Sequence, residues 1–181
     1  MNKAIFLDRD GVLIHNRANY VRSWEDVKIY QSTCQSLSLL AKSEYKIIIL
    51  SNQSAVGRGL MSLQTMMVIN DQLISIIQNS GGRIDGVFVC PHTPEEHCNC
   101  RKPKPGLVFE AKKEFALDLE KSWLVGDALT DLQTGVNSGI NNLVLVESGR
   151  GKKQLKSNKN ELSQIKFFIK KNLWDSMNLF T

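Results

Sequence analysis

The stretch Ile5-Phe6-Leu7-Asp8-Arg9-Asp10-Gly11-Val12 decides the fold of this 181-residue chain. Its apolar first half predicts a short buried strand over residues 4–7, and two acids spaced Asp-x-Asp follow that strand directly. Open parallel α/β sheets bind their ligands at the carboxyl ends of their strands. We therefore expect Asp8 and Asp10 in a ligand site, where one carboxylate can act as nucleophile or metal ligand and the other as general acid.

Short apolar segments alternate with helical patterns through residue 150. Further strands are expected at residues 46–50, 86–90, 123–125 and 142–146, and helices at residues 32–43, 62–80, 107–117 and 131–138. Such alternation indicates βαβ crossovers and a mostly parallel sheet with helices on both faces. The predicted fold is a single Rossmann-like α/β domain over residues 1–150 with a central five-stranded sheet.

The positive charge of the chain is concentrated in its C-terminal tail. The formal net charge is +5, but residues 1–150 contain 16 Lys and Arg against 16 Asp and Glu. Seven lysines follow in residues 151–181, where we expect an amphipathic helix at residues 160–178 that belongs to the same domain. A balanced main body argues against a dedicated nucleic-acid-binding protein, so the lysines are interpreted as a solvated helix face.

The composition, 42% hydrophobic and 23% charged, is typical of globular proteins. No apolar run approaches the roughly 18 residues of a membrane span. The apolar run after Lys3 breaks at Asp8, which is too early for a signal peptide. We therefore expect a cytoplasmic protein that does not bind membranes.

Polar residues also follow other predicted strands at the same edge of the sheet. Ser51 and Asn52 follow the second strand, and Asp127 follows the fourth. The alternative that the Asp-x-Asp pair only caps a turn does not explain this convergence. Two neighbouring acids need a cation or a shared proton, and carboxylate oxygens are ligands that Mg²⁺ prefers.

The segment Arg101-Lys102-Pro103-Lys104-Pro105 adds basic side chains on a stiff backbone. A lysine that reaches the carboxylates would neutralise charge there and bind phosphate. Together these parts indicate phosphoryl transfer, in which one carboxylate attacks phosphorus and a second acid handles the proton. A kinase or dehydrogenase is not indicated, because neither a Gly-Lys-Ser/Thr phosphate loop nor a dinucleotide fingerprint occurs.

Three cysteines and a histidine have the spacing Cys-x-His-x₅-Cys-x-Cys. They are Cys90, His92, Cys98 and Cys100. Three thiolates and one imidazole complete a tetrahedral zinc shell without an open position, which is typical of a structural site. A zinc-stabilised loop would also hold Arg101 and Lys102, which follow the last ligand.

These residues resemble the four ordered motifs of phosphatases of the haloacid dehalogenase superfamily. The motifs correspond to residues 8–11, 51–54, 101–103 and 126–127. The similarity covers about residues 3–148. The cysteine loop narrows it to a small subgroup without a cap domain, whose members act on heptose bisphosphate or histidinol phosphate.

The resemblance implies a role for each motif residue. Asp8 would be the nucleophile and Asp10 the general acid/base, while Ser51 and Lys102 would bind the transferring phosphoryl group. Mg²⁺ would be held by Asp8, the backbone carbonyl of Asp10, and Asp127. Substrate contacts would come from Arg9, Asn19, Tyr20, Asn52, Gln53, Ser54 and Arg101. Ser51 keeps a hydroxyl where threonine is common, whereas Ala128 replaces a charged residue and leaves the role of Asp131 open.

Residues 19–21 and 104–106 look more like the heptose branch of the subgroup. The resemblance therefore implies an enzyme that removes the 7-phosphate of a heptose 1,7-bisphosphate, in the route to nucleotide-activated heptose for lipopolysaccharide core or surface polysaccharide. We expect it to be a monomer. Two enzyme alternatives are histidinol-phosphate phosphatase of histidine biosynthesis and, more distantly, a polynucleotide 3′-phosphatase. A third alternative, from another class, is a zinc-stabilised nucleic-acid-binding module.

Overall fold

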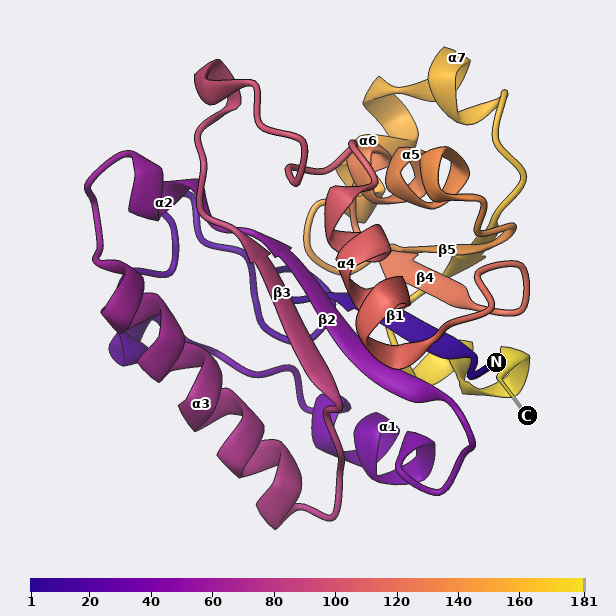
Figure 1. Cartoon of the computed structure of the whole chain (residues 1–181), viewed down its shortest axis with the longest axis horizontal. Helices are drawn as coiled ribbons and strands as arrows, with labels where there is room; N and C mark the ends of the chain where they lie inside the picture. Colours follow the sequence, from indigo (N-terminus) through magenta and orange to yellow (C-terminus); the bar gives the residue numbers. More distant parts are fainter. Residues whose placement is uncertain (181) are drawn as a thin grey trace.

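Six parallel strands form the central sheet of the computed structural model, which describes residues 1–180 (Figure 1). They are β1 Ala4–Asp8, β2 Lys46–Asn52, β3 Gly86–Cys90, β4 Trp123–Gly126, β5 Asn142–Val146 and β6 Phe168–Lys170. The strand order is β3-β2-β1-β4-β5-β6, so the chain moves outward from β1 first in one direction and then in the other. The carboxyl end of β1 therefore lies at the topological switch point, where α/β sheets bind ligands.

Helices cover both faces of this sheet, as the alternation of elements predicts. They are α1 Thr33–Leu40, α2 Ser54–Gly57, α3 Leu63–Asn79, α4 Gly106–Phe115, α5 Leu129–Ser138, α6 Gly151–Ser157 and α7 Lys159–Leu162, with short 3₁₀ turns η1 Trp24–Asp26, η2 Pro94–Glu96 and η3 Trp174–Leu179. Apolar side chains of α1, α3 and η3 share one core cluster, and those of α4, α5 and α7 share the other. No helix within residues 1–180 combines the length and apolar character that a bilayer crossing requires.

The central strand contributes to both clusters because successive side chains of a strand point to opposite faces. Ile5 and Leu7 pack into the cluster of α1 and α3, whereas Ala4 and Phe6 pack into the cluster of α4 and α5. All four are 0% exposed. A strand that is buried on both faces reads as a continuous apolar run, which explains why the sequence predicts β1 and β2 well.

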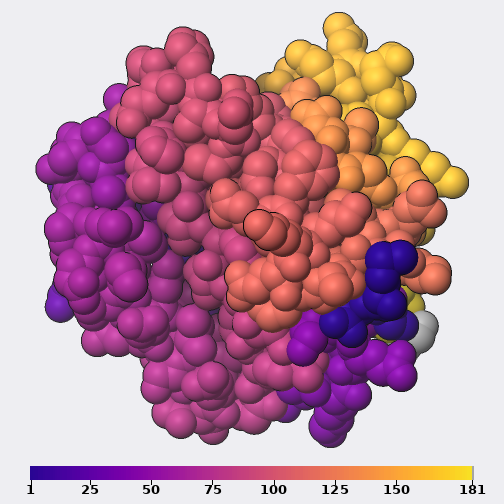
Figure 2. Space-filling view, viewed as in Figure 1, coloured from indigo at the N-terminus to yellow at the C-terminus, as the bar shows by residue number. Residues whose placement is uncertain are grey.

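The prediction of five strands and of one helix over residues 160–178 is wrong. Residues 168–170 form β6, which pairs in parallel with Val144–Val146 at the edge of the sheet. Leu173 and Met177 of the following segment are buried in the cluster of α1 and α3. The apolar spacing of the tail fits a helix, but β5 would otherwise present unpaired backbone groups at the sheet edge, and residues 168–170 pair with them. The tail, drawn in yellow, packs beside the orange residues of the main body (Figure 2).

Candidate active site

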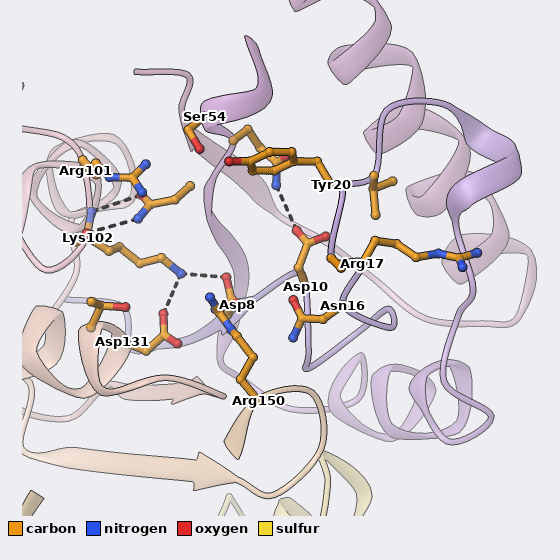
Figure 3. A pocket seen from close by; sticks show the side chains of 15 residues that line it. Asp8, Asp10, Asn16, Arg17, Tyr20, Ser54, Arg101, Lys102, Asp131 and Arg150 are labelled. Atoms are coloured by element: carbon orange, nitrogen blue, oxygen red, sulfur yellow. Dashed lines mark hydrogen bonds and ion pairs between the residues drawn. The ribbon is translucent and has the colours of Figure 1, made fainter. Parts of the chain in front are cut away.

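A cleft of about 630 Å³ opens at the carboxyl end of β1. Its walls come from the loops after β1, β2 and β3, from the start of α5 and from the loop that precedes α6. Its lining includes Asp8, Asp10, Asn52, Lys102, Asp131 and Arg150. Figure 3 shows Arg101 and Lys102 on one side of the cleft, with Tyr20 and Arg17 on the opposite side. The expected convergence of polar residues at this edge is therefore present in the structure.

Lys102 connects the two sides of the carboxylate cluster. Its Nζ donates to Asp8 Oδ1 at 2.6 Å, to Asp131 Oδ1 at 2.6 Å and to the carbonyl oxygen of Leu50 at 3.0 Å. Asn52 clamps the Lys102 backbone, because its amide donates to the Lys102 carbonyl and accepts from the Lys102 N–H, both at 3.1 Å. A residue at the end of β2 thus holds the lysine against the carboxylate at the end of β1.

Asp131 has a defined place in this cluster. One of its carboxylate oxygens accepts from Lys102, and the other accepts from the backbone N–H of Ala128 at 3.0 Å. It is 1% exposed, and a Cβ at Gly126 would collide with its side chain. Asp131 therefore serves as a buried counterion that fixes Lys102 from the α5 side.

Asp127 is fully buried and is surrounded by donors. Arg150 donates to it from Nη2 at 2.9 Å, from Nε at 3.3 Å and from its backbone N–H at 2.7 Å. Asn16 adds a fourth bond at 2.5 Å. Gly11, at φ 108°, lets the loop approach, since a Cβ there would collide with the Asp127 carboxylate.

Sequence reasoning missed Arg150 and Asn16. Arg150 could have been found, because it lies between two glycines just after the fifth strand, at the same sheet edge as the other site residues. Asn16 has no comparable signal. It lies in the irregular loop after β1, and its contact with Asp127 spans 111 residues of sequence.

Asp10 accepts hydrogen bonds from Arg9 and from Gln53. Arg9 itself is 0% exposed and does not line the cleft, so its guanidinium cannot contact substrate in this conformation. Asn19 does not line the cleft either, whereas Tyr20 does. Within this loop, Tyr20 has a left-handed backbone conformation, with φ 64°.

The remaining predicted residues lie at the end of β2 and in the cysteine loop. Ser51 is 1% exposed and lies behind the cleft lining, where its hydroxyl accepts from Gln53 Nε2 at 2.8 Å. Gln53, Ser54 and Arg101 line the cleft. Arg101 also donates to the carbonyl oxygen of His92 at 3.2 Å, which ties the basic segment to the cysteine loop.

The charges of this cluster do not cancel when all of its carboxylates are ionised. Its carboxylates belong to Asp8, Asp10, Asp127 and Asp131, and the cations paired with them belong to Arg9, Lys102 and Arg150. Four negative charges against three positive charges leave one negative charge in excess. Burial raises the pKa of Asp8 to about 8, although the charge of Lys102 acts in the opposite direction.

A divalent cation would change this excess to one positive charge, which favours binding of a phosphate. Carboxylate oxygens of Asp8, Asp127 and Asp131 lie within 4.8 Å of one another. Such hard oxygen donors fit Mg²⁺, which also binds phosphate oxygens. The residues present are therefore suited to a magnesium site.

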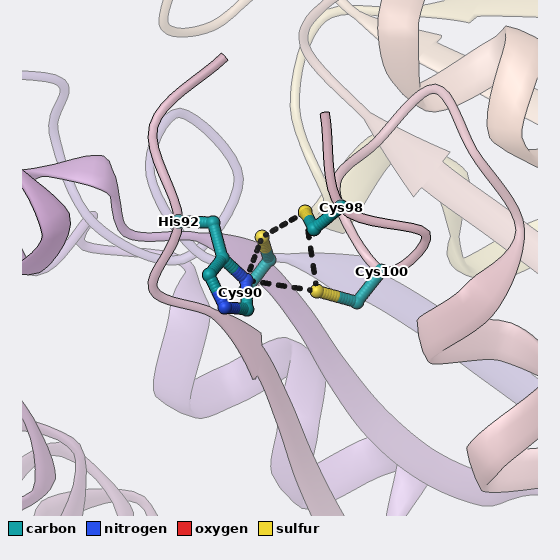
Figure 4. Close-up of side chains that lie close together, drawn as sticks. All are labelled: Cys90, His92, Cys98 and Cys100. Carbon is teal, nitrogen blue, oxygen red and sulfur yellow. Dashed lines mark hydrogen bonds between the residues drawn. The ribbon is translucent and has the colours of Figure 1, made fainter. Parts of the chain in front are cut away.

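The cysteine loop forms a second constellation (Figure 4). Cys98 Sγ lies 3.5 Å from both Cys90 Sγ and Cys100 Sγ. His92 Nδ1 lies 3.6 Å from Cys90 Sγ and 3.3 Å from Cys100 Sγ. A tetrahedral zinc ion with Zn–S bonds of about 2.3 Å needs ligand separations of about 3.5–3.8 Å, so these four atoms fit its shell.

Comparison with known proteins agrees with this geometry. The polynucleotide kinase 3 phosphatase family matches residues 3–173. The chain is also 34% identical to the D-glycero-beta-D-manno-heptose-1,7-bisphosphate 7-phosphatase of Neisseria meningitidis serogroup A, over 90% of this chain and 86% of that protein. The chain belongs to this family of haloacid dehalogenase-like phosphatases. The resemblance deduced from the motifs is therefore confirmed, and the chain is a phosphomonoester hydrolase.

Other phosphatases of the family support the assignment. The enzyme of the same name from Helicobacter pylori strain J99 is 38% identical, over 81% of this chain and 85% of that protein. The crystal structure of the D,D-heptose 1,7-bisphosphate phosphatase from B. bronchiseptica superposes with a TM-score of 0.90 at 30% identity. That comparison covers 98% of this chain and 97% of the other, and the B. bronchiseptica enzyme is complexed with magnesium and phosphate.

Proposed function

We propose that this chain is a Mg²⁺-dependent phosphatase that removes the 7-phosphate of D-glycero-β-D-manno-heptose 1,7-bisphosphate and leaves heptose 1-phosphate. The observation that carries the proposal is the buried Asp8–Lys102 pair at the floor of the cleft. The identity of the sugar in this proposal is taken from the names of the relatives. The product would enter synthesis of nucleotide-activated heptose in the cytoplasm.

Asp8 is the proposed nucleophile. Its carboxylate attacks phosphorus and forms an aspartyl phosphate, while Lys102 Nζ and the Ser51 hydroxyl bind the transferring phosphoryl oxygens. Asp10 gives a proton to the leaving sugar oxygen and then accepts one from the water that hydrolyses the aspartyl phosphate. The 2.6 Å bond from Lys102 Nζ to Asp8 Oδ1, which joins the cysteine loop to the end of β1, supports these roles.

Mg²⁺ would be held by Asp8, by the backbone carbonyl of Asp10 and by Asp127. When bound, it supplies positive charge to the phosphoryl oxygens. Arg150 holds both carboxylate oxygens of Asp127 in this structure. Its guanidinium must therefore release one of them before Asp127 can serve as a ligand.

The second phosphate of the substrate would meet cations at the wall of the cleft. Arg101 is the proposed contact, and Arg17 and Arg150 also line the cleft. Tyr20, Asn52, Gln53 and Ser54 complete the proposed substrate surface. Arg9 and Asn19 lie outside this surface, so we restrict any role they have to indirect effects.

Zn²⁺ is the proposed structural cofactor of the loop after β3. Cys90, His92, Cys98 and Cys100 would hold it, and the closed shell leaves no position for catalysis. The ion would rigidify the loop that carries Arg101 and Lys102. We further propose a monomer whose residues 1–150 form the phosphatase domain without a cap and whose tail completes the sheet.

The proposal is tested by comparing kcat/KM for four substrates with and without Mg²⁺. They are the β and α anomers of heptose 1,7-bisphosphate, histidinol phosphate and a 3′-phosphorylated oligonucleotide. We expect the β anomer to be preferred, phosphate release to require Mg²⁺, and Asp8→Asn to lose activity by orders of magnitude. Preference for histidinol phosphate or the oligonucleotide would overturn the substrate assignment, and full activity of Asp8→Asn would overturn the nucleophile.

A further inference from the structure

Arg9 is a fully buried arginine between two residues that reach the cleft. Burying a guanidinium is costly unless its charge and its donors are satisfied. Its Nε donates to Asp10 Oδ2 at 2.9 Å, its Nη2 to Asp10 Oδ1 at 3.3 Å and its Nη1 to Asn70 Oδ1 at 2.8 Å. The guanidinium therefore joins Asp10 to the middle of α3.

Asn70 lies on the buried face of α3 and is 6% exposed. Its amide nitrogen lies 3.1 Å from Met66 Sδ, which orients the amide so that its oxygen faces Arg9. Asparagine is a poor residue for a helix interior, so a tertiary contact accounts for its presence better than helix propensity. This contact fixes the position of the Arg9 guanidinium.

The two oxygens of Asp10 are not equivalent. Oδ2 accepts from Arg9 Nε and from Gln53 Nε2, both at 2.9 Å, which uses both of its lone pairs. Oδ1 accepts only the longer bond from Arg9 Nη2, and the Asp10 side chain remains 20% exposed towards the cleft. The arrangement leaves Oδ1 with a free lone pair.

We propose that Arg9 and Asn70 are positioning residues that turn Oδ1 of Asp10 towards the leaving group. The inference rests on the proposed function, in which Asp10 is the general acid/base. Oδ1–H gives its proton to the sugar oxygen as the P–O bond breaks, and the bonding electrons stay with that oxygen. Oδ1 then accepts a proton from the water that attacks the aspartyl phosphate.

Steady-state kinetics distinguish positioning from substrate binding. Since Arg9 does not touch the cleft, Arg9→Gln should lower kcat on heptose bisphosphate by about 100-fold and change KM by no more than about twofold. Arg9→Lys keeps the charge but lacks the planar guanidinium that bonds both Asp10 oxygens and Asn70 together, so it should recover only part of the loss. Asn70→Leu, which leaves the Arg9–Asp10 pair intact, should lower kcat about tenfold.

Gln72→Leu provides a matched control, because Gln72 is an exposed residue of the same helix. This variant should have wild-type kinetics. A substrate-binding role for Arg9 would instead raise KM, and that result would overturn the proposal. If Arg9→Gln does not fold, Asn70→Leu decides alone: kinetics equal to those of Gln72→Leu would overturn the proposal.

A substrate with a good leaving group separates the two proton transfers. The phenolate of 4-nitrophenyl phosphate leaves without a proton, so Arg9→Gln and Asn70→Leu should release the first equivalent of nitrophenolate at the wild-type rate and then turn over slowly. Asp10→Asn should show the same burst, and Asp8→Asn should show none. If Asp10→Asn shows no burst, the proposed role of Asp10 fails. If Asp10→Asn shows it but the Arg9 and Asn70 variants behave as wild type, only the positioning proposal fails.

Discussion

Asp8 should make the magnesium-free protein less stable as the pH rises from 6 to 8. Burial raises the pKa of this carboxyl from 3.8 to about 8 in the folded protein. A group whose pKa is raised by folding stabilises the protein at low pH, and that stabilisation is lost as the pH rises through the folded-state value. The stabilisation should therefore be present at pH 6 and largely absent above pH 8.

The size of the effect follows from the two pKa values. A carboxyl that titrates at about 8 when folded and at 3.8 when unfolded loses about 2 kcal/mol of stabilisation between pH 6 and pH 8. For a chain of this length, that loss corresponds to a Tm lower by roughly 4–8 °C. Bound Mg²⁺ favours the carboxylate, so stabilisation by Mg²⁺ should be larger at pH 8 than at pH 6.

Urea unfolding at pH 6, 7 and 8 measures this loss, with Asp8→Asn as the matched control. Magnesium should be removed by gel filtration, because a chelator would also compete for zinc. The asparagine cannot titrate, whereas the other groups of the protein titrate in both forms. The free energy of unfolding of the wild type should fall by about 2 kcal/mol more than that of the variant. Parallel curves for the two proteins would refute the burial argument.

Three further predictions concern other parts of the molecule. Arg150→Gln should bind Mg²⁺ several-fold more tightly in calorimetric titrations, because the guanidinium no longer competes for Asp127; weaker binding would contradict this reading. Cys98→Ser should reduce zinc from about one ion per chain to none by elemental analysis and should lower the Tm. A wild-type protein that loses its zinc without a change in Tm would contradict the zinc shell. Deletion of residues 158–181 should prevent stable folding, because buried Leu162, Leu173, Met177 and Phe180 each contribute about 1.5–3 kcal/mol to a total of about 5–15 kcal/mol. A truncated protein with the wild-type urea midpoint would show that β6 and η3 are dispensable.

The sequence alone was sufficient for the strands around the site. The strands predicted at residues 86–90 and 142–146 match β3 and β5 residue for residue, and β1 and β4 are correct within one residue. Parallel strands buried on both faces are continuous apolar runs, so the signal is local. Asp8, Ser51 and Asp127 follow such runs directly, and strand ends meet at one sheet edge whatever the loops do.

The contacts that organise the site could not be predicted in this way. Arg9 lies between two cleft residues, yet its side chain points to Asn70, 61 residues further along the chain. Lys102, in the loop before α4, meets Asp131 of α5 because α4 and α5 pack against each other. Sequence spacing gives no direction for these side chains, since their orientation depends on the elements packed against them.

The C-terminal segment shows the same limit for secondary structure. Its apolar spacing is compatible with a helix, and residues 168–170 become a strand because β5 leaves an open edge beside them. Local patterns determine which segments can be buried, whereas pairing depends on which backbone groups remain free once the sheet has formed. For this chain, the chemistry of the site was therefore readable from the residues that follow its strands. The ion pairs of the site and strand β6, in contrast, depend on contacts between residues far apart in the sequence.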